Sequence, residues 1–170
     1  MPLSRRHFMQ KTALAAGGLA LAGRARAEKD IAMDTGRPLF VSTWPFGKEA
    51  NEQSLATFDG GGSVLDAVER GIHVAEADAD NASVGLGGIP NADGVVQLDA
   101  CIMDGEGQRG GSVAGIEGIL HPISVARRVM DETKHVMLVG EGARQLALAQ
   151  GFESVELLTE ERRIAWEDWR

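Results

Sequence analysis

The chain has 170 residues, with 17 Lys or Arg, 25 Asp or Glu, a formal net charge of −8 and one cysteine. An acidic chain repels phosphate backbones, so the composition argues against a nucleic-acid-binding protein. The single cysteine, Cys101, rules out an intrachain disulfide, a Cys-x-x-Cys redox pair and a cysteine-rich metal site.

Residues 1–27 are typical of a twin-arginine export signal. Arg5 and Arg6 stand in a basic segment, an apolar run follows over residues 12–23, and residues 25–27 (Ala-Arg-Ala) fit the small-x-small pattern of signal peptidase sites. We expect export to the periplasm and a mature chain that begins near Glu28.

The apolar run of the signal is too short for a membrane anchor. It has about a dozen residues, whereas roughly 20 are needed to cross about 30 Å of hydrocarbon. The signal also carries five basic residues and no acidic one, so its removal takes the net charge from −8 to about −13. We therefore expect an acidic exported protein without a membrane anchor.

The first part of the mature chain predicts a strand, a turn and a helix. Residues 38–43 have a strand-like composition, and the following Trp-Pro-Phe-Gly segment, 44–47, stops the strand and turns. After three glycines, Ser63 with Asp66 three residues later is a typical helix N-cap. The helix that follows has an apolar stripe formed by Val64, Leu65, Val68, Ile72 and Ala75.

Strand and helix patterns then continue to alternate. A glycine-rich loop spans 83–91, a strand is predicted over 95–104, and a second strand is predicted around 112–116. His121-Pro122 starts a helix, and a short apolar strand covers 136–139. A helix is predicted over 141–150, and the charged tail 157–170 favours another helix with Trp166 and Trp169 as docking residues. Interleaved strands and helices predict a layered α/β protein.

The histidines of the mature chain show no metal-ligand spacing. His73, His121 and His135 do not form a His-Glu-x-x-His or similar motif, so the sequence predicts no metal site and no cofactor. His121 stands at a helix start, where we expect it to cap the helix.

Six ordered blocks of the mature chain closely resemble the α-subunit half of the glycosylasparaginase family of N-terminal-nucleophile hydrolases. The resemblance covers roughly 38–170, nearly all of the mature chain. The blocks are Val41-Ser-Thr-Trp-Pro-Phe-Gly47, Gly61-Gly-Ser-Val-Leu-Asp-Ala-Val-Glu69, Ser83-Val-Gly-Leu-Gly-Gly-Ile-Pro90, Leu98-Asp-Ala-Cys-Ile-Met-Asp104, Pro122-Ile-Ser-Val-Ala-Arg127 and His135-Val-Met-Leu-Val-Gly140.

This resemblance implies a fold and an activity. The expected fold is part of an αββα sandwich, with residues 28–170 as a partial α-subunit whose apolar faces and strand edges are left bare. Members of the family cut their own precursor before a threonine, whose hydroxyl then attacks the side-chain amide of a glycosylated asparagine and releases aspartate. The implied partners are a small-molecule substrate and the β-subunit of the same precursor, in an (αβ)2 dimer without a cofactor.

The resemblance also assigns roles to particular residues. No His-Asp-Thr cleavage motif occurs up to Arg170, so we expect the nucleophilic threonine to lie beyond this chain and the chain alone to be inactive. Trp44 and Phe46 match an aromatic pair beside the nucleophile, and Ser83 matches a serine that hydrogen-bonds near it. These three residues form the predicted substrate-site wall on the α-subunit side. Asp99 and Asp104 are expected to be structural.

Two alternatives remain. The first is a plant-type asparaginase or isoaspartyl dipeptidase of the same superfamily, against which the Trp-Pro-Phe-Gly segment favours glycosylasparaginase. The second is a non-catalytic exported binding protein that is complete at Arg170. An in-frame His-Asp-Thr downstream would support the enzyme, and a stop codon at position 171 would support the binding protein.

Overall fold

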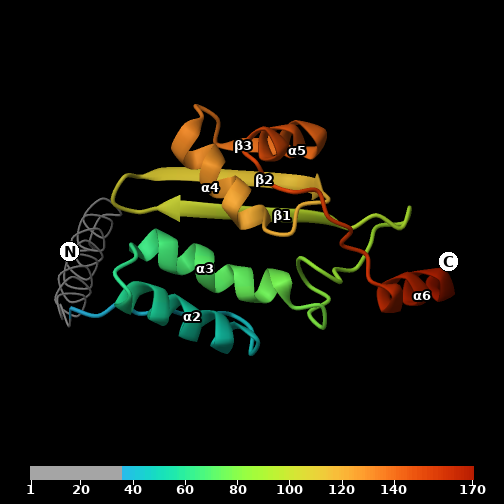
Figure 1. Ribbon diagram of the computed structural model, residues 1–170, viewed down its shortest axis with the longest axis horizontal. Coiled ribbons are helices and arrows are strands. Elements are labelled where there is room, and N and C mark those ends of the chain that lie inside the picture. Colours follow the sequence, from blue (N-terminus) through green and yellow to red (C-terminus); the bar gives the residue numbers. More distant parts are fainter. Residues whose placement is uncertain (1–35) are drawn as a thin grey trace, which may run out of the picture. The chain divides into compact units, whose positions relative to one another are not determined.

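A three-stranded sheet organises the described part of the chain, residues 36–170 of the computed structural model (Figure 1). The predictions for the export signal, residues 1–27, lie outside the described residues. Strand β1 (Gln97–Asp104) pairs antiparallel with β2 (Arg109–Glu117), and β2 pairs in parallel with β3 (Met137–Val139). Residues 40–170 form one unit, which is the unit described below. The three predicted strands from residue 95 onward are thereby confirmed.

Asp99 stabilises an irregularity in this sheet. The β1–β2 register shifts between Leu98, which faces Ile116, and Ala100, which faces Val113. Ala114 and Gly115 of β2 therefore stand opposite the single residue Asp99 of β1. Gly115 has a φ of +58°, which favours glycine, and its N–H donates to Asp99 Oδ1 at 2.7 Å. The predicted structural role of Asp99 is confirmed.

Two helices bury one face of the sheet. Helix α4 (Pro122–Glu132) packs across β1 and β2, and α5 (Gly140–Ala149) packs on β2. The apolar side chains that alternate along β1 and β2 meet the apolar stripe of α4 in one core. This core consists of Val96, Leu98, Ile102, Val113, Ile116, Ile119, Ile123, Val125, Ala126, Val129, Met130, Ala143, Ala147 and Leu157.

The other face of the sheet is open. Because successive side chains of a strand point to opposite faces, the neighbours of the core residues face outward. Met103, Met137 and Val139 are exposed by 77%, 56% and 59%, and the thiol-bearing Cys101 is exposed as well. The described residues thus form one sheet with helices on one face, an α/β arrangement that leaves apolar sheet surface bare, as the sequence predicts.

A helical pair lies beside the sheet (Figure 1). Helix α3 (Val64–Ala77) packs against α2 (Gly47–Asp59) and also contacts α4. Its N-terminus carries a complete capping box, in which Ser63 Oγ accepts from Asp66 N–H at 3.1 Å and Asp66 accepts from Ser63 N–H at 3.0 Å. The predicted helix and its cap are confirmed.

The prediction for residues 38–47 is wrong in part. No strand forms over 38–43 among the described residues, and Leu39 and Val41 are more than 80% exposed. Helix α2, which the sequence pattern does not indicate, begins at Gly47. The pattern fails because α2 is held by small residues rather than by an apolar stripe: its buried residues are Gly47 and Ser54.

The tail forms helix α6 (Glu160–Trp169), as predicted. Trp166 docks on Gly94 and donates its indole N–H to the Ala92 carbonyl at 3.3 Å, whereas Trp169 is 72% exposed. The docking role is therefore confirmed for Trp166 and is wrong for Trp169. Within residues 36–170, no helix is both long and apolar enough to cross a membrane.

Candidate functional site

Trp44 and Phe46 lie in the turn that leads into α2. The turn is closed by Gly47 N–H, which donates to the Trp44 carbonyl at 2.9 Å. Gly47 is buried, and a Cβ there would lie 2.2 Å from the Cβ of Ser42, so the turn requires glycine. Both aromatic side chains are exposed, by 64% and 42%. An exposed aromatic pair on a fixed turn is available to line a binding site.

Ser83 lies on a separate loop, between α3 and β1. Its N–H donates to Asn81 Oδ1 at 3.1 Å, and its side chain is exposed. The loop is held tightly around it: Gly85 has a φ of +69° and touches the α3 backbone, and Arg162 Nε donates to the Gly87 carbonyl at 3.0 Å. The structure brings Trp44 and Phe46 together in one turn and gives Ser83 a place on a different loop. Their shared role as a substrate-site wall stays a prediction.

Glu76 joins the end of α3 to the start of α4. Its side chain is only 1% exposed, and both carboxylate oxygens have partners. His121 Nδ1 donates to Oε2 at 2.9 Å, and the Ile123 N–H donates to Oε1 at 3.1 Å. Burial raises the pKa of Glu76, while these two hydrogen bonds act to lower it. A negative charge here also faces the positive end of the α4 dipole.

The predicted capping role of His121 is wrong. His121 precedes α4 but makes no side-chain hydrogen bond to the helix backbone. Pro122 occupies the first helical position, and the imidazole turns instead to Glu76. The glutamate from α3 therefore satisfies the free Ile123 N–H that a capping side chain would otherwise take.

His73 stacks on His121. The two ring centroids are 3.9 Å apart and the planes differ by 21°. His73 Nε2 is 2.7 Å from Ser124 Oγ, which in turn lies 2.5 Å from Glu69 Oε1. Burial lowers the pKa of His73 to about 4, with further lowering from His121 and Arg70. His73 is therefore uncharged at neutral pH.

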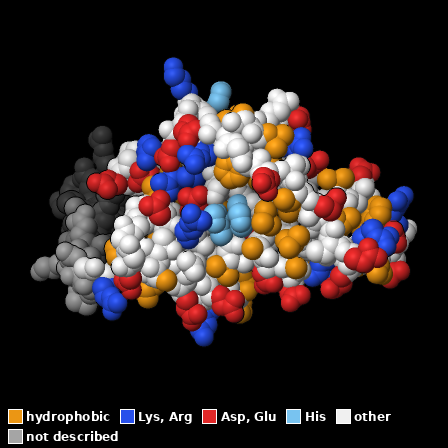
Figure 2. Space-filling model, viewed as in Figure 1, with side chains coloured by type: hydrophobic (Ala, Val, Ile, Leu, Met, Phe, Trp, Pro, Cys, Tyr) orange, Lys and Arg blue, Asp and Glu red, His pale blue; other side chains and the backbone are white. Residues whose placement is uncertain are grey.

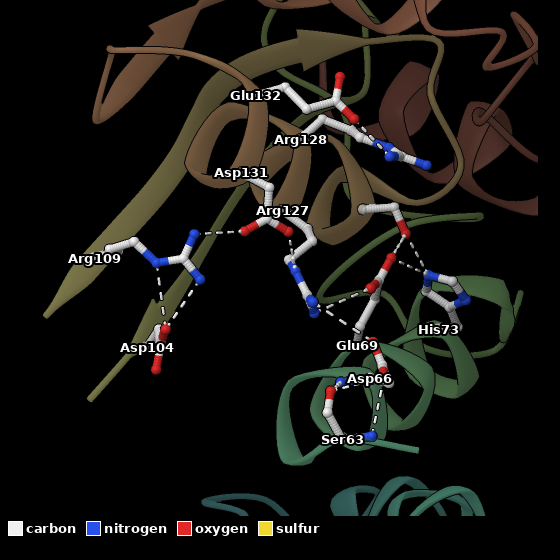
Figure 3. A network of polar contacts seen from close by, with 11 residues as sticks. Ser63, Asp66, Glu69, His73, Asp104, Arg109, Arg127, Arg128, Asp131 and Glu132 are labelled. Atoms are coloured by element: carbon white, nitrogen blue, oxygen red, sulfur yellow. Dashed lines mark hydrogen bonds and ion pairs between the residues drawn. The ribbon is translucent and has the colours of Figure 1, made fainter. Parts of the chain in front are cut away.

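A chain of ion pairs borders this cluster (Figure 3). Arg127 of α4 pairs with Asp131 at 2.5 Å and lies 3.7 Å from Glu69 of α3, and Asp131 also pairs with Arg109 of β2 at 3.0 Å. Arg109 reaches Asp104 of β1 at 3.0 Å, so the network links sheet, α4 and α3. Most members are partly solvated, so each pair contributes little to stability by itself.

Asp104 has the structural role that the sequence predicts. Its carboxylate accepts from Arg109 and from the backbone N–H groups of Gly107 and Glu106, and these bonds lower its pKa. Such carboxylates satisfy the free N–H groups of a tight turn.

Ser124, His73 and Glu69 have the residue types of a hydrolytic triad but not its order. In a triad, the histidine lies between the serine and the carboxylate, so that it takes the serine proton while the carboxylate orients it. Here the Ser124 hydroxyl lies between Glu69 and His73, and the serine is buried. We therefore assign no nucleophile to this cluster.

The sequence pattern missed this cluster. His73 and Glu76 are three residues apart on α3 and so share one helix face, which is a detectable signal. His121, however, follows Glu76 by 45 residues and meets it only through packing of α4 against α3. One ligand atom each from His73, Glu76 and His121 lie within 4.8 Å of one another. These are the described residues that could hold a metal ion.

Comparison with known proteins decides the family. The model of the asparaginase family matches residues 27–170. The chain belongs to the asparaginase family. It is 46% identical over 169 residues to the N(4)-(beta-N-acetylglucosaminyl)-L-asparaginase of Elizabethkingia miricola, covering 98% of this chain and 49% of that protein.

Other asparaginases are also similar. The N(4)-(beta-N-acetylglucosaminyl)-L-asparaginase of Rattus norvegicus is 44% identical over 78% of this chain and 38% of its own length. The plant-type L-asparaginase of Pyrococcus furiosus is 49% identical over 64% of this chain and 35% of its own length. The chain spans half or less of each of these asparaginases. The resemblance seen in the six sequence blocks is confirmed, as is the α/β class.

Proposed function

We propose that this asparaginase-family chain is the α-subunit part of an amidohydrolase that cleaves the side-chain amide of glycosylated asparagine and releases aspartate. The observation that carries the proposal is the 46% identity over 98% of the chain to an N(4)-(beta-N-acetylglucosaminyl)-L-asparaginase. The nucleophile would be an N-terminal threonine, made by autoproteolysis in the half of the precursor that this chain does not cover.

The proposed reaction divides the work between two parts of one precursor. The threonine hydroxyl attacks the amide carbonyl, its own α-amine acts as the base, and water then hydrolyses the acyl-enzyme. This chain would supply one wall of the site, with Trp44 and Phe46 on their turn and Ser83 on its loop. The exposure of these three side chains supports the assignment, because they are free to meet a substrate or a second subunit.

The proposed partner is the β-subunit of the same precursor, in an (αβ)2 dimer. The open sheet face supports such a partner, since apolar side chains such as Met103 and Val139 face outward there. Contiguous exposed apolar surface is typical of an interface. We also propose that residues 1–27 direct twin-arginine export to the periplasm, on the strength of the Arg5-Arg6 pair and the apolar run that follows.

The test compares two proteins made from the same gene. The complete open reading frame and the chain 28–170 are assayed against an asparagine-linked N-acetylglucosamine, a β-aspartyl dipeptide and free asparagine. We expect the complete protein to cut itself and to prefer the glycosylated substrate, and 28–170 alone to be inactive. Turnover by 28–170 above a blank would overturn the proposal, because the nucleophile would then lie within this chain.

The second candidate is a plant-type asparaginase or isoaspartyl dipeptidase. The 49% identity to the plant-type enzyme of Pyrococcus furiosus favours it over an unrelated function. The same assay separates the two, since this candidate predicts faster hydrolysis of the β-aspartyl dipeptide or of asparagine than of the glycosylated compound.

A further inference from the structure

Three donor side chains converge where α3 meets the start of α4. His73 and Glu76 project from one face of α3, and His121 immediately precedes α4. His121 Nδ1 and Glu76 Oε2 are 2.9 Å apart, and a donor atom of His73 lies within 4.8 Å of the other two. None of the three is a predicted substrate-site residue, and the proposed hydrolysis does not use them.

We propose that His73, Glu76 and His121 form a binding site for one transition-metal dication of the Zn²⁺ class. The donor set is two imidazoles and one carboxylate, which suits zinc, copper, nickel or iron better than calcium or magnesium, since the latter two prefer oxygen ligands alone. Solvent would complete the coordination. The bound ion would fasten α3 to the start of α4.

The separation between His121 and Glu76 is close to that of two ligands on one ion. Zinc binds imidazole nitrogen and carboxylate oxygen at about 2.0–2.2 Å, so two ligands of a tetrahedral site lie roughly 3.3–3.6 Å apart. His121 Nδ1 and Glu76 Oε2 are 2.9 Å apart and share one proton. The ion would replace that proton once the two atoms move apart by about half an ångström and both groups turn their lone pairs toward the ion.

His73 has to turn to complete the site. In the stack, its ring plane is nearly parallel to that of His121, and the in-plane lone pairs of parallel rings do not meet at one point. Rotation of the His73 ring out of the stack exchanges its contact with Ser124 Oγ for a bond to the ion. Ser124 keeps its hydrogen bond to Glu69, so no buried hydroxyl loses its last partner.

The surroundings of the three residues suit a metal site. The second oxygen of Glu76 is held by the Ile123 N–H, which fixes the carboxylate in the way that outer partners orient metal ligands. The two imidazoles reach solvent, with side-chain exposures of 18% and 28%, and Figure 2 shows histidine side chains together at the surface in the middle of one face. His73 also lines an open surface cleft with Ser124 and Arg127, which gives an ion a way in.

Titration of Zn²⁺ into the complete, untagged protein tests the site by calorimetry. We expect one ion per chain, with an affinity that falls at least about tenfold in His73→Asn and in His121→Asn. His135→Asn removes an exposed histidine elsewhere, and Cys101→Ser removes the one thiol, so both are matched controls. Neither control should change the affinity.

Two further measurements keep the test decisive if a variant is poorly folded. In the unmodified protein, Zn²⁺ should shift the imidazole NMR signals of His73 and His121 and leave that of His135 in place. Zn²⁺ should also raise the Tm of the unmodified protein more than that of either ligand variant.

Three results would overturn the proposal: no Zn²⁺ bound by the unmodified protein, an affinity in both ligand variants that equals that of the unmodified protein, or loss of binding in a control variant. Each would leave Glu76 and His121 as a structural hydrogen-bonded pair. The readout is metal binding and not hydrolysis, so its outcome is independent of the proposed activity.

Discussion

Gly71 of α3 lies so close to Ser54 of α2 that a methyl group does not fit between them. A Cβ at position 71 would be 2.1 Å from Ser54 Oγ and 2.6 Å from the Ala50 carbonyl oxygen. The Ser54 hydroxyl donates to that same carbonyl at 2.9 Å and is buried. The serine can rotate, but the Ala50 carbonyl belongs to the α2 backbone, so glycine sets the distance between the two helices.

Gly71→Ala should therefore separate α2 from α3. Overpacking of this kind lowers the free energy of unfolding by about 1–3 kcal/mol. Alanine in a helix interior raises it by up to about 1 kcal/mol relative to glycine, so we expect a net loss of stability. Gly142→Ala in α5 is the matched control, since no atom lies within 4 Å of its added Cβ. Urea unfolding should show a lower free energy of unfolding for Gly71→Ala and a higher one for Gly142→Ala than for the unmodified protein. Equal gains in both variants would contradict the close packing.

The capping box of α3 should make stability depend on acid pH. Hydrogen bonds from Ser63 lower the pKa of Asp66 below 3.8 in the folded chain. A carboxyl group with a lowered pKa stabilises the fold at neutral pH, and this contribution disappears as the pH falls through the folded value. Asp66→Asn should therefore be less stable than the unmodified protein at neutral pH, and the difference should shrink in acid.

Replacement of Ser63 measures how much the cap contributes to the free energy of unfolding. Ser63→Ala should lower the free energy of unfolding by about 0.5–2 kcal/mol at neutral pH. Glu52→Gln, at an exposed site on α2, serves as a control for the loss of one carboxylate. A stability difference between Asp66→Asn and the unmodified protein that stays constant from neutral to acid pH would refute the role of the Asp66 carboxylate.

The two tryptophans of α6 should behave differently. Trp166 packs on Gly94 and hydrogen-bonds to Ala92, so Trp166→Ala should lower stability by about 1–3 kcal/mol through lost burial. Trp169→Ala should change stability by no more than about 0.5 kcal/mol, because its ring is exposed. Thermal unfolding of the same chain measures both, and equal effects would contradict the selective docking of Trp166.

Ser83→Ala in the complete protein tests the predicted substrate-site wall. If Ser83 hydrogen-bonds near the nucleophile, its loss should slow turnover about ten- to a thousandfold. Folding should change little, because the loop is held by the Ser83 backbone N–H and not by its hydroxyl. Ser154→Ala, at an exposed serine on another loop, should leave the rate unchanged. A lowered Tm with normal turnover in Ser83→Ala would make Ser83 a structural residue.

Changing Arg5 and Arg6 together to lysine should block export. Lysine keeps the charge but lacks the planar guanidinium group that a receptor can recognise. The double variant should remain in the cytoplasm with its signal uncleaved, whereas Arg24→Lys with Arg26→Lys should be exported. Cell fractionation and the size of the protein on a gel measure both. Normal periplasmic accumulation of the variant with lysine at positions 5 and 6 would show that the export receptor does not recognise this arginine pair.

Local sequence was enough to predict the elements whose sequence pattern lies within the element itself. The Ser63–Asp66 cap, the alternation along β1 and the His121-Pro122 helix start act within a few residues, so their patterns survive in any tertiary context. The same holds for Asp104, whose carboxylate accepts from backbone N–H groups of the turn that directly follows it, whereas Asp99 bonds to Gly115 on the neighbouring strand. The ordered sequence blocks then indicated the family.

Only the tertiary structure decided those features that depend on contacts between segments distant in the sequence. Residues 38–43 have the composition of a strand, but a strand needs a pairing partner, and none forms among the described residues. Helix α2 lacks an apolar stripe and is held by the contact of Ser54 with Gly71, which lies on another helix. His73, Glu76 and His121 come together only because α4 packs on α3. The reason is the same in each case: the sequence of one segment does not identify the distant segment that it contacts, so only the folded chain shows these contacts.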